Sequence, residues 1–303
     1  MNVAEALKFI RTKRKLTQKQ MKTKYIDPSA YSRIEGNKRS VRMNDLQDLL
    51  KIMSINTSEF FSIVNLDNDL QGMKDLYYYC AYNLDDKTSK RRLVNEYEKL
   101  VEKNCKSLKD FAQYIGIKSY FSQFWKEIES INDFDVTEVY KILCEKEYFF
   151  QADYILLTNI IPYFTKEQGA MILSNAFPVK DIELRDYETK KFASRVLLNW
   201  ITTRLYENDF DTAKIFIKIA KNQTEFNYDY SYKLNVQYLS DLLNLLLTGE
   251  PDYYDSILSF ISILENVGDI VQAKAVREEV KLLTHNRLIG EVITTRNPAY
   301  VHR

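Results

Sequence analysis

The sequence predicts an all-α protein with two parts, a small N-terminal helical bundle and a larger array of paired helices. Only 7 glycines and 5 prolines occur in 303 residues, too few for the tight turns of a β fold. Apolar residues recur at helical spacing along most of the chain. Charge also divides the chain, because residues 1–62 carry 13 Lys and Arg against 6 Asp and Glu, while the rest carry 30 against 36. A basic segment joined to an acidic one is expected where only one part meets a polyanion.

Spacing and capping residues predict the first two helices of the bundle. Apolar residues at i, i+3, i+4 and i+7 predict a first helix, and they are Val3, Ala6, Leu7 and Ile10. Thr17, followed three positions later by Gln20, has the spacing of a capping box. We therefore expect a second, shorter helix that carries Met21 inward.

Two further helices are expected before residue 62. Asp27 is a good N-cap, Pro28 suits the first helical position and Gly36 should end this third helix. Its expected buried residues are Ala30, Tyr31 and Ile34. The fourth helix is expected to turn inward Met43, Leu46, Leu49, Leu50 and Met53. Phe60 and Phe61 should close the core behind it.

Two short helices joined by a tight connection, the second with exposed polar residues, predict a helix-turn-helix that places its second helix in the DNA major groove. Arg33 could bind guanine O6 and N7 through its planar guanidinium. Ser29 could contact a base edge or a phosphate, and Pro28 could offer apolar contact to a thymine methyl. Gln18, at the start of the second helix, is placed to meet a phosphate.

Basic residues follow directly after the predicted reading helix. Lys38, Arg39 and Arg42 would flank the groove and neutralise phosphates. The full predicted DNA-binding set is Gln18, Pro28, Ser29, Ser32, Arg33, Asn37, Lys38, Arg39 and Arg42. The alternative is a small helical bundle whose basic face is merely solvated.

Three stretches carry a resemblance to the Cro/CI (XRE) helix-turn-helix family: Gln18, residues 31–36 (Tyr-Ser-Arg-Ile-Glu-Gly) and residues 58–61 (Ser-Glu-Phe-Phe). The connection between the two helices is one residue shorter than usual there and lacks the common glycine. This shorter spacing is similar to the Rgg/GadR/MutR regulators of Gram-positive bacteria, which the chain as a whole resembles. The resemblance implies a DNA-binding domain followed by a tetratricopeptide-like, peptide-sensing domain.

The sequence departs from this family at two positions. Lys22 stands where a small residue is usual, which affects helix spacing, and Pro28 stands where a longer polar side chain often reads a base, which affects sequence preference. In the family, an arginine of the first helix pairs with the glutamate that ends the reading helix. Arg11 and Glu35 match these positions, and the resemblance implies a structural ion pair between them.

Helical periodicity continues after a short linker expected at residues 65–68. The expected helices cover residues 69–84, 88–104, 107–128, 134–146, 149–162, 165–176, 181–207, 209–222, 229–248, 251–267 and 269–284. The chain should therefore divide into a DNA-binding domain (1–64), this linker, a regulatory and dimerisation domain (69–284) and a C-terminal tail or cap (285–303).

A weak internal repeat supports a helical-repeat array for the second part. Residues 206–217 resemble residues 265–276, with Asp209 matching Asp269. Ala152, Ala213 and Ala273 occupy equivalent positions at offsets of 61 and 60 residues. A turn followed by an alanine where neighbouring helices cross closely is typical of tetratricopeptide-like arrays.

Polar residues within apolar helices are candidates for contact with a peptide, because carboxamides both donate to and accept from peptide backbone. Asparagine is also unfavourable inside a helix, so its presence calls for a reason. The candidates are Asn159, Arg195, Asn199, Asn235, Tyr238 and Asn244. The competing interpretation, which we consider stronger for any single asparagine, is an exposed or inter-helix hydrogen-bonding side chain.

Nothing in the sequence predicts catalysis, a cofactor or a metal site. His285 and His302 are the only histidines, no cysteine lies near either, and no P-loop, G-x-S-x-G or G-x-G-x-x-G motif occurs. The three cysteines, Cys80, Cys105 and Cys144, are unevenly spaced, which favours unpaired thiols in a reducing cytoplasm. No apolar run is long enough to cross a membrane, and no secretory signal is evident.

The sequence therefore predicts a cytoplasmic, homodimeric transcriptional regulator that binds promoter DNA and senses a short hydrophobic signalling peptide, with RNA polymerase as a further possible partner. One alternative is a DNA-binding regulator whose repeat domain serves only for dimerisation and protein docking. Another is an enzyme-like or inhibitory repeat protein with a vestigial bundle, which should leave no specific DNA footprint.

Overall fold

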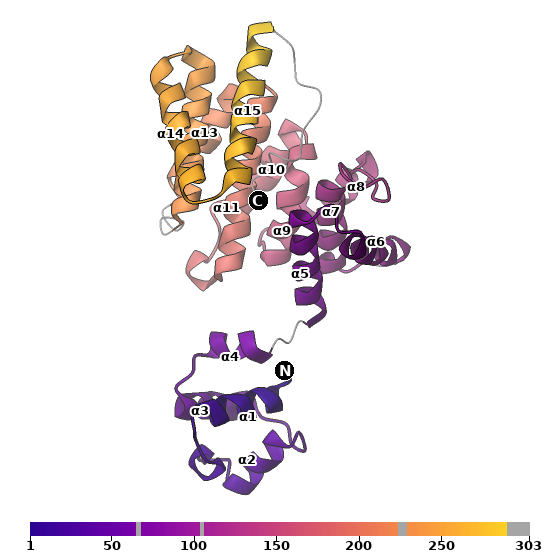
Figure 1. The fold of residues 1–303 in the computed structure, drawn as a ribbon, viewed down its shortest axis with the longest axis vertical. Helices are drawn as coiled ribbons and strands as arrows, with labels where there is room; N and C mark the ends of the chain where they lie inside the picture. Colours follow the sequence, from indigo (N-terminus) through magenta and orange to yellow (C-terminus); the bar gives the residue numbers. More distant parts are fainter. Residues whose placement is uncertain (65–67, 104–105, 224–228, 290–303) are drawn as a thin grey trace. The chain divides into compact units, whose positions relative to one another are not determined.

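The computed structural model describes residues 1–64, 68–103, 106–223 and 229–289, and all regular structure in these ranges is helical (Figure 1). The predicted all-α class is confirmed. The chain divides into two compact units, Met1–Ser89 and Lys90–Arg303. The predicted boundary at residue 64 falls inside the first unit, and residues 65–67 of the predicted linker lie outside the described residues.

In its described residues, the first unit contains five α-helices and one turn of 3₁₀ helix, and α6 crosses the division between the units. The elements are α1 (Val3–Lys13), η1 (Gln18–Met21), α2 (Pro28–Glu35), α3 (Met43–Met53), α4 (Thr57–Val64) and α5 (Asn68–Tyr82). The core of the bundle includes Leu7, Met21, Tyr31, Leu49 and Phe60, all fully buried. The predicted elements are therefore present, although the second is a single 3₁₀ turn.

One predicted core residue of the bundle is wrong. Met43 is 61% exposed, whereas Leu46, Leu49, Leu50 and Met53 are buried as predicted. Met43 is the first residue of α3 and precedes the part of the helix that packs against the bundle. The buried stripe of this helix begins one turn later.

The second unit is an array of helices, most of which pack on their neighbours in sequence. It contains α6 (Lys87–Glu102), α7 (Leu108–Phe121), α8 (Asp133–Cys144), α9 (Gln151–Ile160), η2 (Ile161–Tyr163), α10 (Lys166–Ala176), η3 (Ile182–Leu184), α11 (Tyr187–Tyr206), α12 (Phe210–Lys221), α13 (Tyr230–Thr248), α14 (Pro251–Asn266) and α15 (Ile270–Ile289). Helix α9 packs on α7 and α11, and α11 to α15 pack in succession (Figure 1).

Three helix boundaries differ from prediction by several residues. The helix predicted over 107–128 ends at Phe121, because the chain then forms turns that still bury Trp125 and Ile128. The helix predicted over 181–207 begins at Tyr187, where Asp186 caps it. Helix α15 continues to Ile289, five residues into the predicted tail, and residues 290–303 lie outside the described residues.

The internal repeat has a structural counterpart at two of its three positions. A residue in the left-handed conformation, Asn208 or Gly268, precedes each aspartate of the repeat. Asp209 then accepts a hydrogen bond from the N–H of Thr212, and Asp269 accepts one from the N–H of Gln272. Ala213 and Ala273 are buried at the helix contacts that follow, whereas Ala152 of the third copy is half-buried.

Within the part of the chain that the structure describes, no helix is long and apolar enough to cross a membrane. The described residues also contain no group of three or more His, Cys, Asp or Glu side chains that could hold a metal ion. Cys80 is buried and Cys144 is half-buried. Cys105 lies outside the described residues.

Candidate nucleic-acid interface

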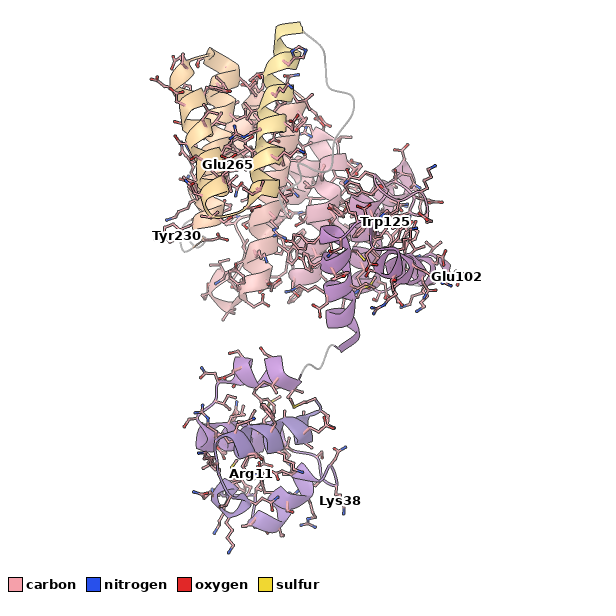
Figure 2. The ribbon with its side chains drawn as sticks, in the orientation of Figure 1. Arg11, Lys38, Glu102, Trp125, Tyr230 and Glu265 are labelled. Carbon is pink, nitrogen blue, oxygen red and sulfur yellow. The ribbon has the colours of Figure 1, made fainter. Side chains whose placement is uncertain are left out.

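Helix α2 has one buried, mainly apolar face and one polar, exposed face. Ala30, Tyr31 and Ile34 are buried, as predicted, whereas Ser29, Ser32 and Arg33 are exposed. The remaining predicted contacts on this helix and the segment after it are exposed or half-exposed: Pro28, Asn37, Lys38, Arg39 and Arg42. In Figure 2, Lys38 lies at the surface of the bundle. The predicted reading residues and the predicted phosphate contacts thus belong to one helix and the segment that follows it.

The turn after α2 fixes where the basic residues start. Asn37 adopts the left-handed conformation, and the N–H of Lys38 donates to the Arg33 carbonyl at 2.8 Å. This hydrogen bond satisfies a carbonyl at the helix end and closes the last turn. The backbone of Lys38 is therefore held directly against that of Arg33.

Asp27 organises the start of α2. Its Oδ1 accepts hydrogen bonds from the Ala30 N–H at 2.7 Å and from the Ser29 hydroxyl at 2.9 Å. The Ala30 and Ser29 hydrogen bonds lower the pKa of Asp27 below its ordinary value. Because the Ser29 hydroxyl hydrogen is directed at Asp27, its oxygen is left to accept, which suits the exocyclic amino groups of adenine or cytosine.

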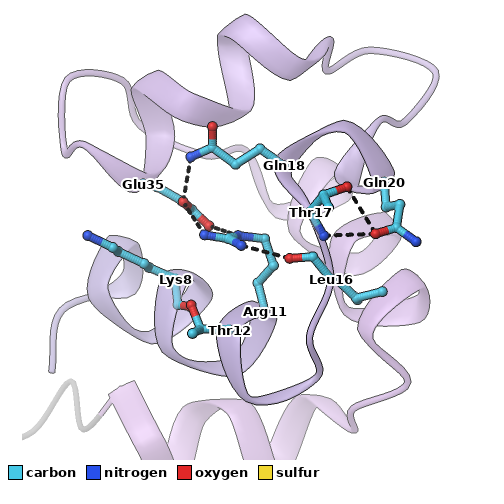
Figure 3. Close-up of polar contacts among 8 residues, drawn as sticks. All are labelled: Lys8, Arg11, Thr12, Leu16, Thr17, Gln18, Gln20 and Glu35. Atoms are coloured by element: carbon cyan, nitrogen blue, oxygen red, sulfur yellow. Dashed lines mark hydrogen bonds and ion pairs between the residues drawn. The ribbon is translucent and has the colours of Figure 1, made fainter.

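A hydrogen-bonded clamp behind α2 joins three elements (Figure 3). Arg11 of α1 donates to both carboxylate oxygens of Glu35, from Nε at 2.6 Å and from Nη2 at 3.1 Å. Its Nη1 donates to the Leu16 carbonyl at 2.7 Å. Gln18 of η1 donates from Nε2 to Glu35 Oε2 at 2.8 Å. The ion pair implied by the resemblance is present, with Gln18 and Leu16 as additional members.

The Glu35 side chain is only 3% exposed, so its charge depends on this clamp. Burial alone would raise its pKa, but hydrogen bonds from Arg11 and Gln18 outweigh burial, and the pKa of Glu35 is lowered. Burial also raises the pKa of the neighbouring Tyr31 phenol. The carboxylate therefore stays ionised at neutral pH and holds the end of α2 against α1.

Sequence reasoning did not predict how the short connection before α2 is built. The Thr23 hydroxyl accepts hydrogen bonds from the N–H groups of Tyr25 and Ile26, and the Thr23 N–H donates to the Ile26 carbonyl. These bonds close the connection without the glycine that the resemblance would lead one to expect. The signal in the sequence was Thr23 itself, because a threonine hydroxyl can accept hydrogen bonds from backbone N–H groups two or three residues later and so close a turn.

Gln18 makes a contact that the sequence did not predict. Its side-chain nitrogen is directed at Glu35, whereas the sequence predicts a phosphate contact. The amide carries a second N–H, and the residue is half-exposed at the start of η1. Gln18 can therefore contribute to the clamp and still face a phosphate.

The predicted peptide contacts of the second unit fall into two groups. Asn159 accepts a hydrogen bond from Ser119 of α7 at 3.1 Å, and Asn199, only 1% exposed, donates to the Thr158 carbonyl of α9 at 3.0 Å. Tyr238, also 1% exposed, donates to Glu279 of α15 at 2.6 Å. All three residues form inter-helix hydrogen bonds, and for the two asparagines this is what the competing interpretation expects.

The other three candidates are half-buried. Arg195 lies over the Phe192 ring, and Asn244 lies on α13. Asn235, also on α13, donates to the Ser231 carbonyl. Its Oδ1 is buried and accepts no hydrogen bond from the described residues. An amide oxygen of this kind is the feature a ligand N–H would satisfy.

No protein-family model matches the chain, and no curated protein matches it. Solved structures do match over nearly the whole length. PrgX in its complex with cCF10 gives a TM-score of 0.77 at 18% identity, covering 93% of this chain and 92% of PrgX. The SHP pheromone receptor Rgg2 of Streptococcus dysgalactiae gives 0.72 at 15% identity, covering 92% and 99%. A putative transcriptional regulator from Listeria monocytogenes EGD-e gives 0.75 at 14% identity, covering 94% and 98%. The chain therefore has the fold of these proteins.

Proposed function

We propose that this protein is a sequence-specific DNA-binding transcriptional regulator that acts as a homodimer in the cytoplasm, without catalytic activity, and whose helical array senses a short signalling peptide. The observation that carries the DNA-binding part is the surface formed by Ser29, Ser32 and Arg33 with the basic residues Lys38, Arg39 and Arg42. It is built on a helix whose opposite side is held by the clamp. Two such helices in a dimer would read two half-sites of an operator. RNA polymerase is a further partner in this proposal.

Arg33→Ala should relax operator preference, because Arg33 is the exposed arginine of α2 and its guanidinium can bind guanine through two hydrogen bonds. We expect a loss of about 1–3 kcal/mol of discrimination at one base pair. Lys38→Ala or Arg42→Ala should instead weaken binding to all sequences and reduce the slope of log affinity against log salt by about 1 per lost phosphate contact. Fluorescence anisotropy on neighbouring promoters, over a range of salt, measures both quantities.

Lys51→Ala is the matched control, since it removes an equal charge from α3, outside the proposed surface. It should leave the salt slope close to that of the wild type. If Arg33→Ala, Lys38→Ala and Arg42→Ala all bind DNA as the wild type does, the assignment of this surface is wrong.

The peptide-sensing part is supported by the full-length likeness to a pheromone receptor and to PrgX in complex with cCF10, together with the unsatisfied oxygen of Asn235. A ligand can act only through different affinities for two arrangements of the array. Such a shift would reposition the paired DNA-binding domains.

Titration calorimetry with synthetic hydrophobic peptides encoded near the gene tests this part. Asn235→Ala should weaken binding about three- to tenfold, the contribution of one hydrogen bond. Asn222→Ala, at the exposed end of α12, should not change it. Absence of binding across the panel, with DNA binding intact, would favour a repeat domain used only for dimerisation and protein docking.

A further inference from the structure

A buried carboxyl group lies between α15 and α13. Glu279 of α15 is 3% exposed, and the Tyr238 hydroxyl of α13 donates to its Oε2 at 2.6 Å. Its other oxygen, Oε1, is buried and accepts no hydrogen bond from the described residues. No ion pair within the described ranges includes Glu279. An ionised carboxylate in this place would be poorly compensated.

Phenols and apolar side chains are the described groups that face Glu279 from the neighbouring helices. On α13, besides Tyr238, Asp241 is buried and accepts a hydrogen bond from Gln237. From α11, the phenol of Tyr206 faces the carboxyl. Helix α14 presents apolar side chains, including Phe260, which stacks on Tyr238 with ring centroids 5.1 Å apart.

The charged side chains of α15 that the structure describes are exposed, apart from Glu279 itself. Arg277 pairs with Glu265 of α14, and Glu278, Lys281 and His285 are exposed. Burial is the dominant influence on Glu279 and raises its pKa to about 7, although the hydrogen bond from Tyr238 and the nearby Tyr206 hydroxyl act in the opposite direction. The neutral and ionised forms are therefore both accessible near neutral pH.

We propose that Glu279 makes the docking of α15 on α13 sensitive to pH, the neutral carboxyl holding the helix in place and the ionised carboxyl loosening it. This inference goes beyond the proposed function and requires neither DNA nor peptide. Its consequence is a terminal helix of the array whose attachment weakens as the surroundings change from mildly acidic to neutral.

The direction of this pH dependence follows from the raised pKa of Glu279. The docked state binds the Glu279 proton more tightly than an undocked, solvated state, in which the pKa is near its ordinary value of 4.5. Docking is therefore strongest below that ordinary value, weakens as the pH rises from 4.5 to about 7, and weakens no further above it. Between about pH 5.5 and about pH 7.5 the docking equilibrium should fall roughly twentyfold.

Amide hydrogen exchange of the full chain, corrected for the intrinsic effect of pH on exchange rates, measures this equilibrium on residues 270–289. We expect protection of α15 in the wild type to fall roughly twentyfold across that interval. Glu279→Gln cannot ionise, so its protection should be independent of pH. Glu278→Gln, which removes the adjacent exposed carboxylate, should keep the wild-type dependence and serves as the matched control.

Tyr238→Phe supplies a second test that does not depend on the folding of Glu279→Gln. Removing this donor takes away a hydrogen bond that favours the ionised form, so the pH at which the loss of protection levels off should rise. The inference is overturned if α15 of the wild type shows no pH dependence. It is equally overturned if Glu279→Gln follows the wild-type profile, or if Tyr238→Phe leaves the pH dependence where it was.

Discussion

Gly169→Ala should destabilise the second unit by about 3 kcal/mol, at the upper end of the usual cost of overpacking a core. Gly169 lies inside α10, and a Cβ at this position would overlap Cη2 and Cζ3 of Trp200 from α11. Trp200 is fully buried, and its ring meets that of Phe216 edge to face, with the ring centroids 6.0 Å apart. The indole ring therefore has little room to move. Thermal unfolding followed by circular dichroism should show the loss as a lower melting temperature.

Gly116→Ala is the matched control for this substitution. Gly116 also lies within a buried part of a helix, α7, but a Cβ there would meet its nearest atom, Nδ2 of Asn159, at an ordinary 3.5 Å. We expect this variant to be as stable as the wild type or more stable by up to about 1 kcal/mol, because alanine favours the helix.

A double-mutant cycle assigns the Gly169 effect to the indole. If the overlap with Trp200 is the cause, Gly169→Ala combined with Trp200→Phe should cost less than the sum of the two single changes. Equal stabilities of Gly169→Ala and Gly116→Ala would mean that α10 does not approach the indole as closely as the structure has it.

Local chemistry accounts for the parts of the fold that the sequence predicted well. Asp27 and Asp209 accept backbone hydrogen bonds at the starts of their helices, and each helix begins at the next residue. A cap and the periodic residues after it act within one or two turns, so sequence alone can locate them. The bundle and the order of helices in the array are accordingly close to prediction.

Periodicity failed where a segment keeps apolar spacing without being helical. Trp125 and Ile128 continue the spacing of α7, yet they are buried by turns after Phe121. Apolar spacing reports which residues face a core, and irregular backbone can satisfy the same pattern. Met43 shows the converse, because a residue in phase with a buried stripe is exposed when the helix begins there.

The contacts on which the proposals and stability predictions rest join residues far apart in the sequence. Gln18 meets Glu35, Trp200 meets Gly169, and Tyr238 meets Glu279. No local pattern specifies such pairs, because they depend on how whole helices pack. The family resemblance predicted the ion pair between Arg11 and Glu35. It did not predict that Gln18 and the Leu16 carbonyl would be further hydrogen-bond partners of this pair.

Arg11→Met should destabilise the first unit by about 3–5 kcal/mol, the usual cost of removing one partner from a buried ion pair. The Glu35 carboxylate would remain buried with Gln18 as its donor, and the end of α2 would lose its connection to α1. Hydrogen exchange on residues 1–64 of the full chain should report this loss. Operator affinity should fall with it, since α2 carries the proposed reading residues.

Arg14→Met is the matched control, because Arg14 follows α1 and its exposed side chain donates to the Ser54 carbonyl rather than to a carboxylate. Its effect should stay below about 1 kcal/mol. Arg11→Met combined with Glu35→Met should recover much of the stability lost in Arg11→Met, because a buried pair replaced on both sides by apolar residues leaves no uncompensated charge. A double variant no more stable than Arg11→Met would show that the clamp acts through shape rather than through charge.

Acid should have the same effect on the bundle as removing the clamp. The pKa of Glu35 is lower in the folded protein than its ordinary value of 4.5, so its contribution is complete above that ordinary value and is lost as the pH falls through the lowered one. Glu35→Gln should therefore make the bundle less stable at neutral pH and flatten its decline in acid. Should the acid profile of residues 1–64 be the same in Glu35→Gln and wild type, Glu35 would not be the carboxylate whose charge holds α2 against α1.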